Sequence, residues 1–387
     1  MAKRSAIGSF NGTLSSLSAP DIAAQVITEM LKDTQNLKKE DIEEVYIGNV
    51  LNAGMGQAPA RQAALKAGLP DSIPCTTVSK VCGSGLKSVM LADLTIRAGE
   101  ADVVLAGGME NMSQSPYLLP KIRNGLRLGH GQLIDSMIKD GLWDVYNDYH
   151  MGNAAELCAE KYSISREKQD AYAKMSYERA INANANGLFK DEIATVRAKS
   201  RKEELLFEHD EELQKVNFDK FPNLKPAFTS NGTITAANAS SLSDGASMTL
   251  LLSEEKVKEN DLQPMARIVA QAQAAQKPEW FSTAPAASIK KLLTKASLKV
   301  QDIDFWEINE AFSSVAIANR MLLEIDLSKL NVRGGAVAMG HPIGASGNRV
   351  LVTLLHTLKQ EKKKYGVASL CIGGGEAVSV LVENLHV

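Results

Sequence analysis

Two distant stretches of the chain share one pattern of apolar and polar positions. Each has a segment with helical spacing, then a polar connection, then a short apolar run typical of a buried strand. The stretches are residues 27–31, 37–42 and 45–47 near the start, and residues 289–293, 298–303 and 305–308 later. The copies lie about 262 residues apart, a shift that a duplication would produce.

The same shift continues further along the chain. Ser84-Gly85-Leu86-Lys87 matches Ser346-Gly347-Asn348-Arg349, and apolar strands that end in glycines follow at 103–108 and 367–375. One such match arises by chance, but three in order favour a duplicated half-domain. Strands alternate with helices in each half, so we expect an α/β protein with mainly parallel sheets covered by helices.

A different region separates the halves. Residues 112–242 are richer in charge and mix helix and loop signals, which indicates an insertion into the first half. We therefore expect a first half made of residues 1–111 plus 243–263, a loop domain at 112–242, and a second half at 264–387. Loops inserted in a rigid scaffold often contact the substrate.

The repeat also exposes a mismatch. The second half opens with an apolar strand pattern at 267–270, whose counterpart falls at Ser5-Ala6-Ile7-Gly8, where no apolar strand is evident. Two explanations remain open at this stage. Either the true start of the protein lies upstream, or the first sheet lacks a strand that its twin possesses.

Composition narrows the possible partners. The chain has 43 Lys and Arg against 45 Asp and Glu, a formal net charge of −2, so charge gives no basis for binding nucleic acid. No segment approaches the roughly 18 consecutive apolar residues of a membrane span, and residues 1–10 do not resemble a secretory signal. The four cysteines have no metal-ligand spacing. We expect a cytoplasmic protein with neither nucleic acid nor membrane as its partner.

Cys82 lies in Val81-Cys82-Gly83-Ser84-Gly85, between an expected strand and an expected helix. The glycines permit a tight turn and the close approach of a ligand. A thiol at a helix N-terminus faces unpaired N–H groups and the positive end of the helix dipole, which favours the thiolate. The segment alone does not separate a nucleophile from a buried structural cysteine, which is the commoner role.

Three further residues have chemically useful positions. Cys371 ends the matching strand of the second half, either as a small apolar strand residue before a glycine turn or beside N–H groups that the glycines expose for an oxyanion. His341 stands between a glycine and a proline, just before the twin of the Cys82 loop, and a nearby imidazole activates a cysteine. Asn309 closes a strand and serves either as a turn former or as an amide that holds a water. The duplication predicts that His341 and Cys82 approach one centre.

Together these segments resemble the signature blocks of the thiolase family. The blocks are Val81-Cys82-Gly83-Ser84-Gly85, Asn309-Glu310-Ala311-Phe312, Gly340-His341-Pro342 and Cys371-Ile372-Gly373-Gly374. They occur in family order with family spacing, and the similarity extends over essentially the whole chain. The resemblance implies a five-layered α/β/α/β/α fold of two duplicated halves, with an inserted loop domain that binds coenzyme A.

The resemblance also implies a reaction in two steps. Cys82 attacks a thioester carbonyl while His341 accepts its proton, and Cys371 takes the α-proton of a second acetyl-CoA. One oxyanion site is implied at His341 with a water held on Asn309, and another at the backbone N–H groups of Cys82 and Gly373. A Claisen step develops negative charge on two carbonyl oxygens, so two sets of donors suit this chemistry.

Within the family, the chain is most similar to short-chain acetoacetyl-CoA thiolases. Tyr149-His150-Met151-Gly152 resembles the loop beside their acyl pocket, and Phe281 falls at a bulky pocket position, although a bulky residue also suits core packing. The resemblance implies substrate contacts at Leu142, His150, Met151, Ala227, Phe228, Ser240, Phe281, Ala311 and Phe312. It implies coenzyme A as substrate and product, with no covalently bound cofactor.

A potassium site is a further implication. The loop at 235–240 is similar to the alanine-rich loop of the mitochondrial-type enzyme, which binds potassium through a tyrosine hydroxyl and carbonyl groups. The matching positions are Tyr177, Ala236, Ala237, Ala239 and Val337. Carbonyl oxygens suit a hard cation, but a close-packed loop without an ion explains the same sequence.

Three rival functions remain. A long-chain 3-ketoacyl-CoA thiolase of fatty-acid β-oxidation differs only in the depth of its pocket, and a ketoacyl-synthase-type condensing enzyme lacks the cysteine at the position of Cys371. The third rival is a non-catalytic CoA-binding protein, which would retain the fold without the reactive residues. Related thiolases are dimers or dimers of dimers, and the segment after Met112 resembles their tetramerisation loop, so we expect a homotetramer.

Overall fold

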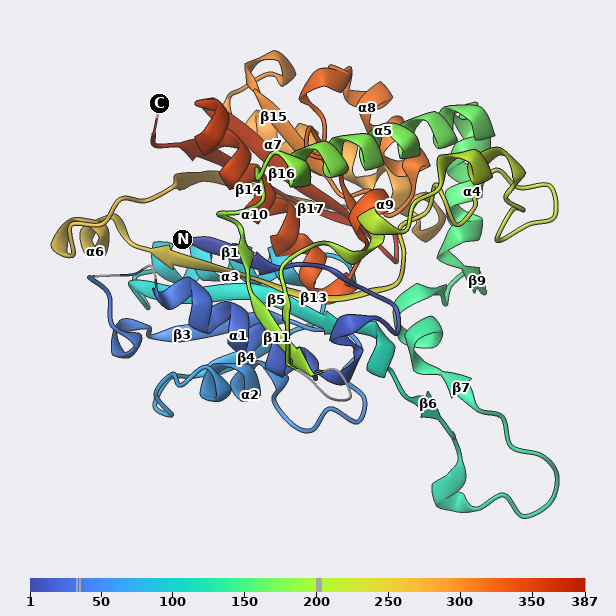
Figure 1. The fold of residues 1–387 in the computed structure, drawn as a ribbon, viewed down its shortest axis with the longest axis horizontal. Coiled ribbons are helices and arrows are strands. Elements are labelled where there is room, and N and C mark those ends of the chain that lie inside the picture. The colour runs from blue at the N-terminus through green and yellow to red at the C-terminus, as the bar shows by residue number, and fades with distance from the viewer. Residues whose placement is uncertain (33, 35, 200–203, 387) are drawn as a thin grey trace.

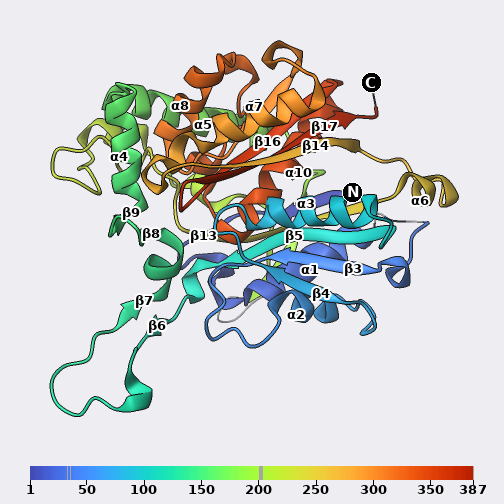
Figure 2. The ribbon, with the colours of Figure 1, turned by 180° about the vertical axis from the view of Figure 1, so that it is seen from behind.

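The two halves stack as five alternating layers of helices and sheets (Figures 1 and 2). The structure is a computed structural model that describes residues 1–32, 34, 36–199 and 204–386. From one side to the other, the layers are a helix pair, a first sheet, a central helix pair, a second sheet and an outer helix pair. These helices are α1 (Ala19–Lys32) and α2 (Pro59–Lys66), α3 (Ser84–Arg97) and α10 (Ile343–Glu361), and α7 (Ala284–Ala296) and α8 (Ser313–Leu323). The predicted fold is confirmed.

The first sheet has the order β10-β1-β13-β5-β3-β4, and a short strand, β2, also pairs with β13. Its strands are β1 (Ala2–Ser5), β2 (Gly8–Ser9), β3 (Glu44–Gly48), β4 (Cys75–Val78), β5 (Val103–Asn111), β10 (Ile193–Ala194) and β13 (Ser243–Leu252). The pairs β3–β5 and β3–β4 are parallel, whereas β13 runs antiparallel to both of its neighbours β1 and β5.

The second sheet repeats the middle of the first, in the order β14-β17-β16-β15. Its strands are β14 (Ala266–Ala275), β15 (Phe305–Ile308), β16 (Tyr365–Ile372) and β17 (Glu376–Asn384). Here β15 and β16 are parallel and β17 is antiparallel to both neighbours, which matches β3, β5 and β13. The strands predicted at 45–47, 103–108, 305–308 and 367–370 all form, so the repeat deduced from the sequence is structural.

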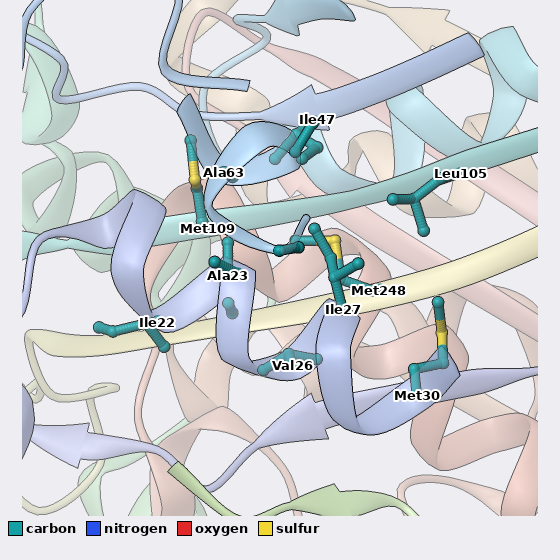
Figure 3. Close-up of a cluster of buried hydrophobic side chains, with 14 of the residues drawn as sticks. Ile22, Ala23, Val26, Ile27, Met30, Ile47, Ala63, Leu105, Met109 and Met248 are labelled. Atoms are coloured by element: carbon teal, nitrogen blue, oxygen red, sulfur yellow. The ribbon is translucent and has the colours of Figure 1, made fainter. Parts of the chain in front are cut away.

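Helix α1 shows how apolar residues at helical spacing pack against the first sheet. Its buried residues recur with helical spacing, so one face of the helix meets the first sheet. Figure 3 shows Ile22, Val26 and Met30 on this helix beside Leu105 and Met109 of β5, within one buried cluster. Burying each large apolar side chain contributes about 1.5–3 kcal/mol.

Strand β1 corrects one expectation from the sequence. The first sheet does contain a strand at its start, so the explanation that it lacks this strand is wrong. The strand lies at Ala2–Ser5 rather than at residues 5–8, and its pattern is not apolar because Arg4 and Ser5 are polar although both are fully buried. The Arg4 guanidinium is satisfied by Glu192 at 2.6 Å and by Asp210 at 2.7 Å, two carboxylates from the inserted region. A buried charge with such partners is tolerated in a strand.

The central helices α3 and α10 pack closely at twin glycines. A Cβ on Gly85 would lie 2.9 Å from the Asn348 nitrogen, and one on Gly347 would overlap the Leu86 nitrogen. The matched sequence segments of the two halves therefore cross each other. Because each helix begins directly after a catalytic candidate loop, this contact sets the separation of the two loops.

The inserted region adds helices and small hairpins around one end of the sheets (Figure 1). Its elements are β6 (Tyr117–Leu118), β7 (Ile134–Asp135), β8 (Trp143–Asp144), β9 (Tyr149–His150), α4 (Met151–Lys161), α5 (Arg166–Ala185), β11 (Val196–Lys199) and β12 (Glu204–Phe207). Helix α6 (Glu254–Glu259) lies in the connection to the second half, and α9 (Ala336–Met339) precedes the His341 loop. None of the described helices has the length and apolar character of a membrane span.

Candidate active site

Cys82 lies in a strained turn between β4 and α3. Val81, directly before it, has a φ of 45°, a left-handed conformation that a β-branched residue rarely adopts. The Ser84 hydroxyl braces the turn, because it accepts a hydrogen bond from the Lys80 N–H at 2.8 Å and donates one to the Val81 carbonyl at 2.7 Å. The backbone on both sides of Cys82 is thereby fixed.

The Cys82 thiol is protonated at neutral pH. Burial raises its pKa to about 11, and the Glu110 carboxyl acts in the same direction. The backbone N–H groups of Gly373 and of Cys82 itself form hydrogen bonds that lower the pKa but do not outweigh burial. The N–H groups therefore favour the thiolate in direction, as expected at a helix N-terminus, but loss of solvent destabilises the charged form more.

His341 presents an unprotonated nitrogen. Its Nδ1 lies 2.6 Å from the Ser346 Oγ, and that hydroxyl donates to the Pro342 carbonyl at 2.9 Å. Since a hydroxyl has one proton, it accepts a hydrogen bond from Nδ1–H, and Nε2 retains its lone pair. Burial lowers the pKa of His341 to about 3, and the charge of Arg349 adds to this effect. The ring is neutral and ready to accept a proton on Nε2.

Asn309 lies directly behind this imidazole. Its Nδ2 is 3.5 Å from His341 Nε2, at the outer limit of a hydrogen bond. Its Oδ1 is buried and has no hydrogen-bond partner among the described residues. The backbone N–H of Asn309 donates to the Ser369 carbonyl at 3.0 Å, which holds the residue at the end of β15. The amide therefore faces the same centre as His341 with an unused acceptor.

Glu110, at the end of β5, is a site residue that the sequence analysis missed. Its carboxyl accepts hydrogen bonds from Asn49 Nδ2 at 2.7 Å, from the Val50 and Leu51 N–H groups at 3.1 Å each, and from the Gly344 N–H at 2.9 Å. Burial raises its pKa to about 7. The carboxyl joins the loop after β3 to the N-terminus of α10. The signal available in the sequence was a charged residue near the end of an otherwise apolar strand.

Glu310 has a similar bracing role on the other side of the site. It accepts hydrogen bonds from the Tyr172 hydroxyl at 2.9 Å, the Ser176 hydroxyl at 2.7 Å, Asn331 Nδ2 at 2.9 Å and the Val337 N–H at 3.1 Å. These donors come from the inserted helix α5 and from the second half. Glu310 thus fixes the segment that carries Asn309 against the inserted region.

A pocket of about 300 Å³, here called the acyl pocket, collects most of the predicted site residues. Those lining it are Cys82, Leu142, His150, Met151, Phe228, Ala239, Ser240, Phe281, Ala311, Phe312, His341 and Gly373. The residues that line it without having been predicted are Met112, Met137, Ile138, Gly141, Ser241, Leu242 and Ile343. The lining is mainly apolar, so any reaction at Cys82 takes place in a poorly hydrated space.

Three residues predicted for catalysis or substrate binding lie outside this lining, as do Tyr177, Ala236, Ala237 and Val337, which were predicted for potassium. Asn309 and Cys371 are buried behind the lining, and Ala227 is exposed beside Phe228. Burial raises the pKa of Cys371 well above its usual range, and Cys82 contributes in the same direction. Cys371 is consequently a protonated thiol at neutral pH.

His150 supplies a polar group within the apolar lining. Its Nδ1 accepts the Gly152 N–H at 3.0 Å as the N-cap of α4, so in the neutral ring the proton is on Nε2. Burial lowers the pKa of His150 and keeps the ring neutral. The ring stacks on Phe228 with centroids 4.8 Å apart. His150 is therefore an oriented N–H donor.

An aromatic group forms one wall of the acyl pocket. Phe312 meets Phe228 at 6.0 Å and Phe281 at 6.4 Å between ring centroids, both edge to face. Phe281 is only 3% exposed. Cys371 belongs to the same buried cluster, so the wall also covers the second sulfur. Such a wall restricts the size of the group that reaches Cys82.

The chain matches two family models, the thiolase N-terminal domain over residues 1–255 and the thiolase C-terminal domain over residues 262–384. It is 48% identical over 389 residues to the acetyl-CoA acetyltransferase of Schizosaccharomyces pombe, covering 99% of this chain and 98% of the relative.

Two solved structures have the same fold. The Bacillus anthracis acetyl-CoA acetyltransferase superposes with a TM-score of 0.97 at 40% identity, covering 99% of this chain and 97% of that one. An Ascaris suum thiolase in complex with coenzyme A superposes with a TM-score of 0.94 at 42% identity, covering 99% and 98%. The chain therefore belongs to the thiolase family and is an acyltransferase.

Proposed function

We propose that this chain catalyses the reversible Claisen condensation of two acetyl-CoA molecules to acetoacetyl-CoA and coenzyme A, as an acetyl-CoA C-acetyltransferase. One observation carries the proposal. Two loops at matched positions of the two halves bring a cysteine and a neutral imidazole to one small apolar pocket, where backbone N–H groups already contact the sulfur. The names of the similar proteins support the same reaction.

The cleavage direction begins at Cys82. Its sulfur attacks the ketone carbon of acetoacetyl-CoA as its proton passes to His341 Nε2, whose lone pair Ser346 keeps available. The carbon–carbon bond then breaks, leaving an acetyl group on Cys82 and the enolate of acetyl-CoA. The protonated Cys371 thiol donates its proton to the enolate carbon and becomes a thiolate.

The second half-reaction restores both cysteines. Coenzyme A enters, and its thiol proton passes to the Cys371 thiolate. The coenzyme A sulfur attacks the acetyl-Cys82 carbonyl, and the departing Cys82 sulfur regains its proton from His341. Two acetyl-CoA molecules result, and condensation follows the same steps in reverse. The raised pKa of Cys371 suits a group that donates its proton to an enolate.

Two donor sets would stabilise the oxyanions. The N–H groups of Cys82 and Gly373, which lie against the sulfur, suit the oxygen of the acyl group being attacked. The other carbonyl oxygen would be held at His341 together with a water on the buried amide of Asn309. Each donor lost typically reduces the rate about a hundredfold or more.

Coenzyme A would lie along the inserted region. Ser240, whose hydroxyl donates to the Ala311 carbonyl at 2.9 Å, lines the acyl pocket together with Leu142, and exposed Ala227 and neighbouring Phe228 follow the path outward. The Ascaris suum thiolase was solved with coenzyme A bound. Phe281 and Met151 would limit the acyl group to a short chain.

A potassium ion fits the loop at residues 235–240, beside Tyr177 of α5. Tyr177, Ala237 and Val337 belong to one buried cluster. Within the described residues, the carbonyls of Ala236, Ala237, Ala239 and Val337 accept no backbone or side-chain hydrogen bond. These oxygens and the Tyr177 hydroxyl would hold the ion, which supplies positive charge that orders the loop beside Ser240. Equal activity and thermal stability in sodium and potassium buffers would contradict this.

The β6–β7 arm supports a homotetramer, arranged as a dimer of dimers. The arm projects from the body (Figure 1) and exposes large apolar side chains, including Leu128 at 100% and Leu133 at 70% exposure. Exposed apolar residues of this kind mark an interaction surface. Sedimentation velocity should give the tetramer mass, and a monomer would contradict the proposal.

The division into parts and the cellular location are further proposals. The first half would comprise 1–111 and 243–263, the loop domain 112–242, and the second half 264–387. In support, β5 ends at Asn111 and β13 returns to the same sheet from Ser243. All four cysteines are free thiols, which suits a reducing cytoplasm. Cleavage at Ser240–Ser243 by limited proteolysis would test the boundary.

The decisive experiment is CoA-dependent cleavage of acetoacetyl-CoA beside a long-chain 3-ketoacyl-CoA. We expect cleavage of the short substrate only, its loss in Cys82→Ala, and its retention in Cys75→Ala, which removes a half-buried thiol outside the acyl pocket. Equal cleavage of the long substrate would indicate a broad-range thiolase of β-oxidation. Failure of the folded wild type to cleave either would contradict the proposed function.

A further inference from the structure

Arg349 is a buried cation of the central helix α10, and it lies outside the lining of the acyl pocket. Its Nη1 is 3.8 Å from Glu307 Oε2, beyond hydrogen-bond distance, and the two side chains are 2% and 3% exposed. Neither Nη1 nor Nη2 has a hydrogen-bond partner among the described residues. Enclosing a guanidinium in this way is unfavourable, because the cation loses its water and gains few hydrogen bonds in return.

The Arg349–Glu307 pair is also a weak source of stability. Burial raises the pKa of Glu307 to about 8 although Arg349 opposes the shift, so the carboxyl is only partly ionised at neutral pH. Replacing a buried pair by apolar side chains of similar volume is often neutral or stabilising. Further charges that act on the pair are those of Arg4 in β1, Glu192 before β10, Glu310 after β15 and Arg333 before α9. Stability therefore does not explain why the pair is present.

Glu307 shares one face of β15 with Asn309. Side chains alternate along a strand, so residues 305, 307 and 309 point to the same side. Phe305 packs against the apolar cluster that contains much of α10, whereas Trp306 belongs to the cluster beneath the outer helices α7 and α8. Glu307 and Asn309 therefore both face the central layer, towards α10.

Arg349 lies about one helical turn after Ser346 on α10. The Ser346 hydroxyl is 2.6 Å from His341 Nδ1, and Asn309 Nδ2 is 3.5 Å from His341 Nε2. The imidazole is thus held between α10 on one side and the end of β15 on the other. The Arg349–Glu307 contact joins these same two elements.

We propose that Arg349 is a positioning residue for His341, and that it acts by holding α10 against β15 through Glu307. This contact sets the separation of the two groups that orient the ring, Ser346 and Asn309. The positive charge also disfavours a resting proton on the imidazole, since it adds to the effect of burial in lowering the pKa of His341. The inference rests on the proposed function, in which His341 accepts the thiol proton.

Replacing the whole pair by apolar residues separates positioning from stability. Arg349→Met combined with Glu307→Leu removes both polar groups and keeps most of their volume, so the Tm should stay within a few degrees of wild type or rise. The kcat for acetoacetyl-CoA cleavage should nevertheless fall roughly tenfold or more, as expected when a catalytic group is misplaced. KM should change little, because neither residue lines the acyl pocket. A folded double variant with wild-type kcat would overturn the proposal.

The tautomer of His341 gives a readout that does not depend on activity. In wild-type protein with isotope-labelled histidine and no substrate, nitrogen NMR should show a protonated Nδ1 and an unprotonated Nε2, as the contact with Ser346 requires. In the double variant the two signals should move towards each other as the ring exchanges between tautomers, and unchanged signals would overturn the proposal. If the wild type failed to cleave acetoacetyl-CoA, the proposed function would fall, and these signals would still decide the role of Arg349.

Two single variants complete the test. Arg349→Lys keeps a cation but shortens the side chain and removes the guanidinium fork. We expect its kcat to lie several-fold below wild type and above the double variant, and a wild-type kcat would overturn the proposal even if the double variant did not fold.

Arg333→Met is the matched control. Arg333 is also buried, but it donates to Gln360 Oε1 at 2.6 Å, near the far end of α10, and to the Leu188 carbonyl at 3.1 Å. Its loss should leave the kcat per folded molecule and the His341 signals unchanged. An equal loss of kcat in this variant would overturn the proposal, because any disturbance of the buried charges would then have the same effect.

Discussion

Ser84 and Ser346 occupy matched positions in the two halves, each in the first turn of a central helix. Each hydroxyl donates to a carbonyl of the loop before it, Val81 in the first half and Pro342 in the second. What each accepts differs. Ser84 accepts the Lys80 backbone N–H, whereas Ser346 faces the imidazole of His341.

The difference shows that a serine hydroxyl at equivalent positions has a different role in each half. In the first half the serine stabilises the backbone turn that presents Cys82. In the second half the same hydroxyl selects the tautomer of a proton acceptor. The nucleophile and the base therefore derive their geometry from equivalent braces, while burial keeps both groups neutral until substrate arrives.

The largest expected effect is the pH dependence of the rate at which the Cys82 thiol is chemically modified. Because its pKa is raised to about 11, the thiolate fraction is small at pH 7 and increases with pH. The rate of iodoacetamide modification at Cys82 should rise about tenfold per pH unit from pH 7 to 10, about a thousandfold overall. Mass spectrometry follows the site, with Cys82→Ala as the blank. A plateau near pH 7 would mean that His341 already holds the proton at rest.

The next largest effect is expected for Ser346→Ala, as a loss of kcat. Without the hydroxyl, Nδ1 loses its acceptor and the ring is free to change tautomer. We expect kcat for acetoacetyl-CoA cleavage to fall roughly a hundredfold with little change in KM, and the acidic limb of the pH profile to shift. Ser346→Thr, which keeps a hydroxyl, should recover part of the loss. A variant with a wild-type pH profile would show that the serine only packs.

A smaller effect is expected for Ser84→Ala, which sharpens the comparison. The Lys80 N–H and Val81 carbonyl lose a shared partner, so the free energy of unfolding should fall by about 1–3 kcal/mol. Because no imidazole depends on this serine, kcat per folded molecule should fall less than in Ser346→Ala. Urea denaturation and steady-state kinetics on both variants provide the test, and a larger kcat loss here would reverse the assignment.

The smallest effect concerns an ion pair that connects the two halves. Lys80 precedes the Cys82 turn and pairs with Glu376, which follows the Gly373 turn; their side chains are 24% and 38% exposed. Partly exposed pairs contribute less than about 1 kcal/mol. Glu376→Gln should lower the free energy of unfolding by no more than this. Glu259→Gln, in a solvated pair with Lys256, is the matched control, and a several-fold loss of kcat would reveal a catalytic contribution.

Much of the fold could be predicted from the spacing of apolar residues along the sequence. The predicted strands at 45–47 and 305–308 form in equivalent places, and their apolar runs are mostly buried, β3 within the first sheet and β15 at the edge of the second. Strand β1 was not predicted because three of its four residues, Lys3, Arg4 and Ser5, are polar. The partners of Arg4, Glu192 and Asp210, lie about two hundred residues away in sequence, and no local pattern reports such a pairing.

The candidate site, like the fold, could be predicted from the sequence only in part. Residue types and the repeat predicted that Cys82 and His341 meet at one pocket, whereas the effect of burial on the pKa of the thiol was not predicted. A helix N-terminus is visible in sequence, but enclosure by Met112, Met137 and other side chains of the inserted region is not. Enclosure decides the pKa, so this property becomes accessible only with the tertiary structure.

The crossing of α3 and α10 at Gly85 and Gly347 has a historical consequence. Two identical half-length chains, paired through this contact, would bring two helix starts together just as closely. By symmetry, however, both starts would carry the same residue. Division of labour between a nucleophile and a base requires two helix starts that mutate independently, and joining two copies in one chain provides that freedom.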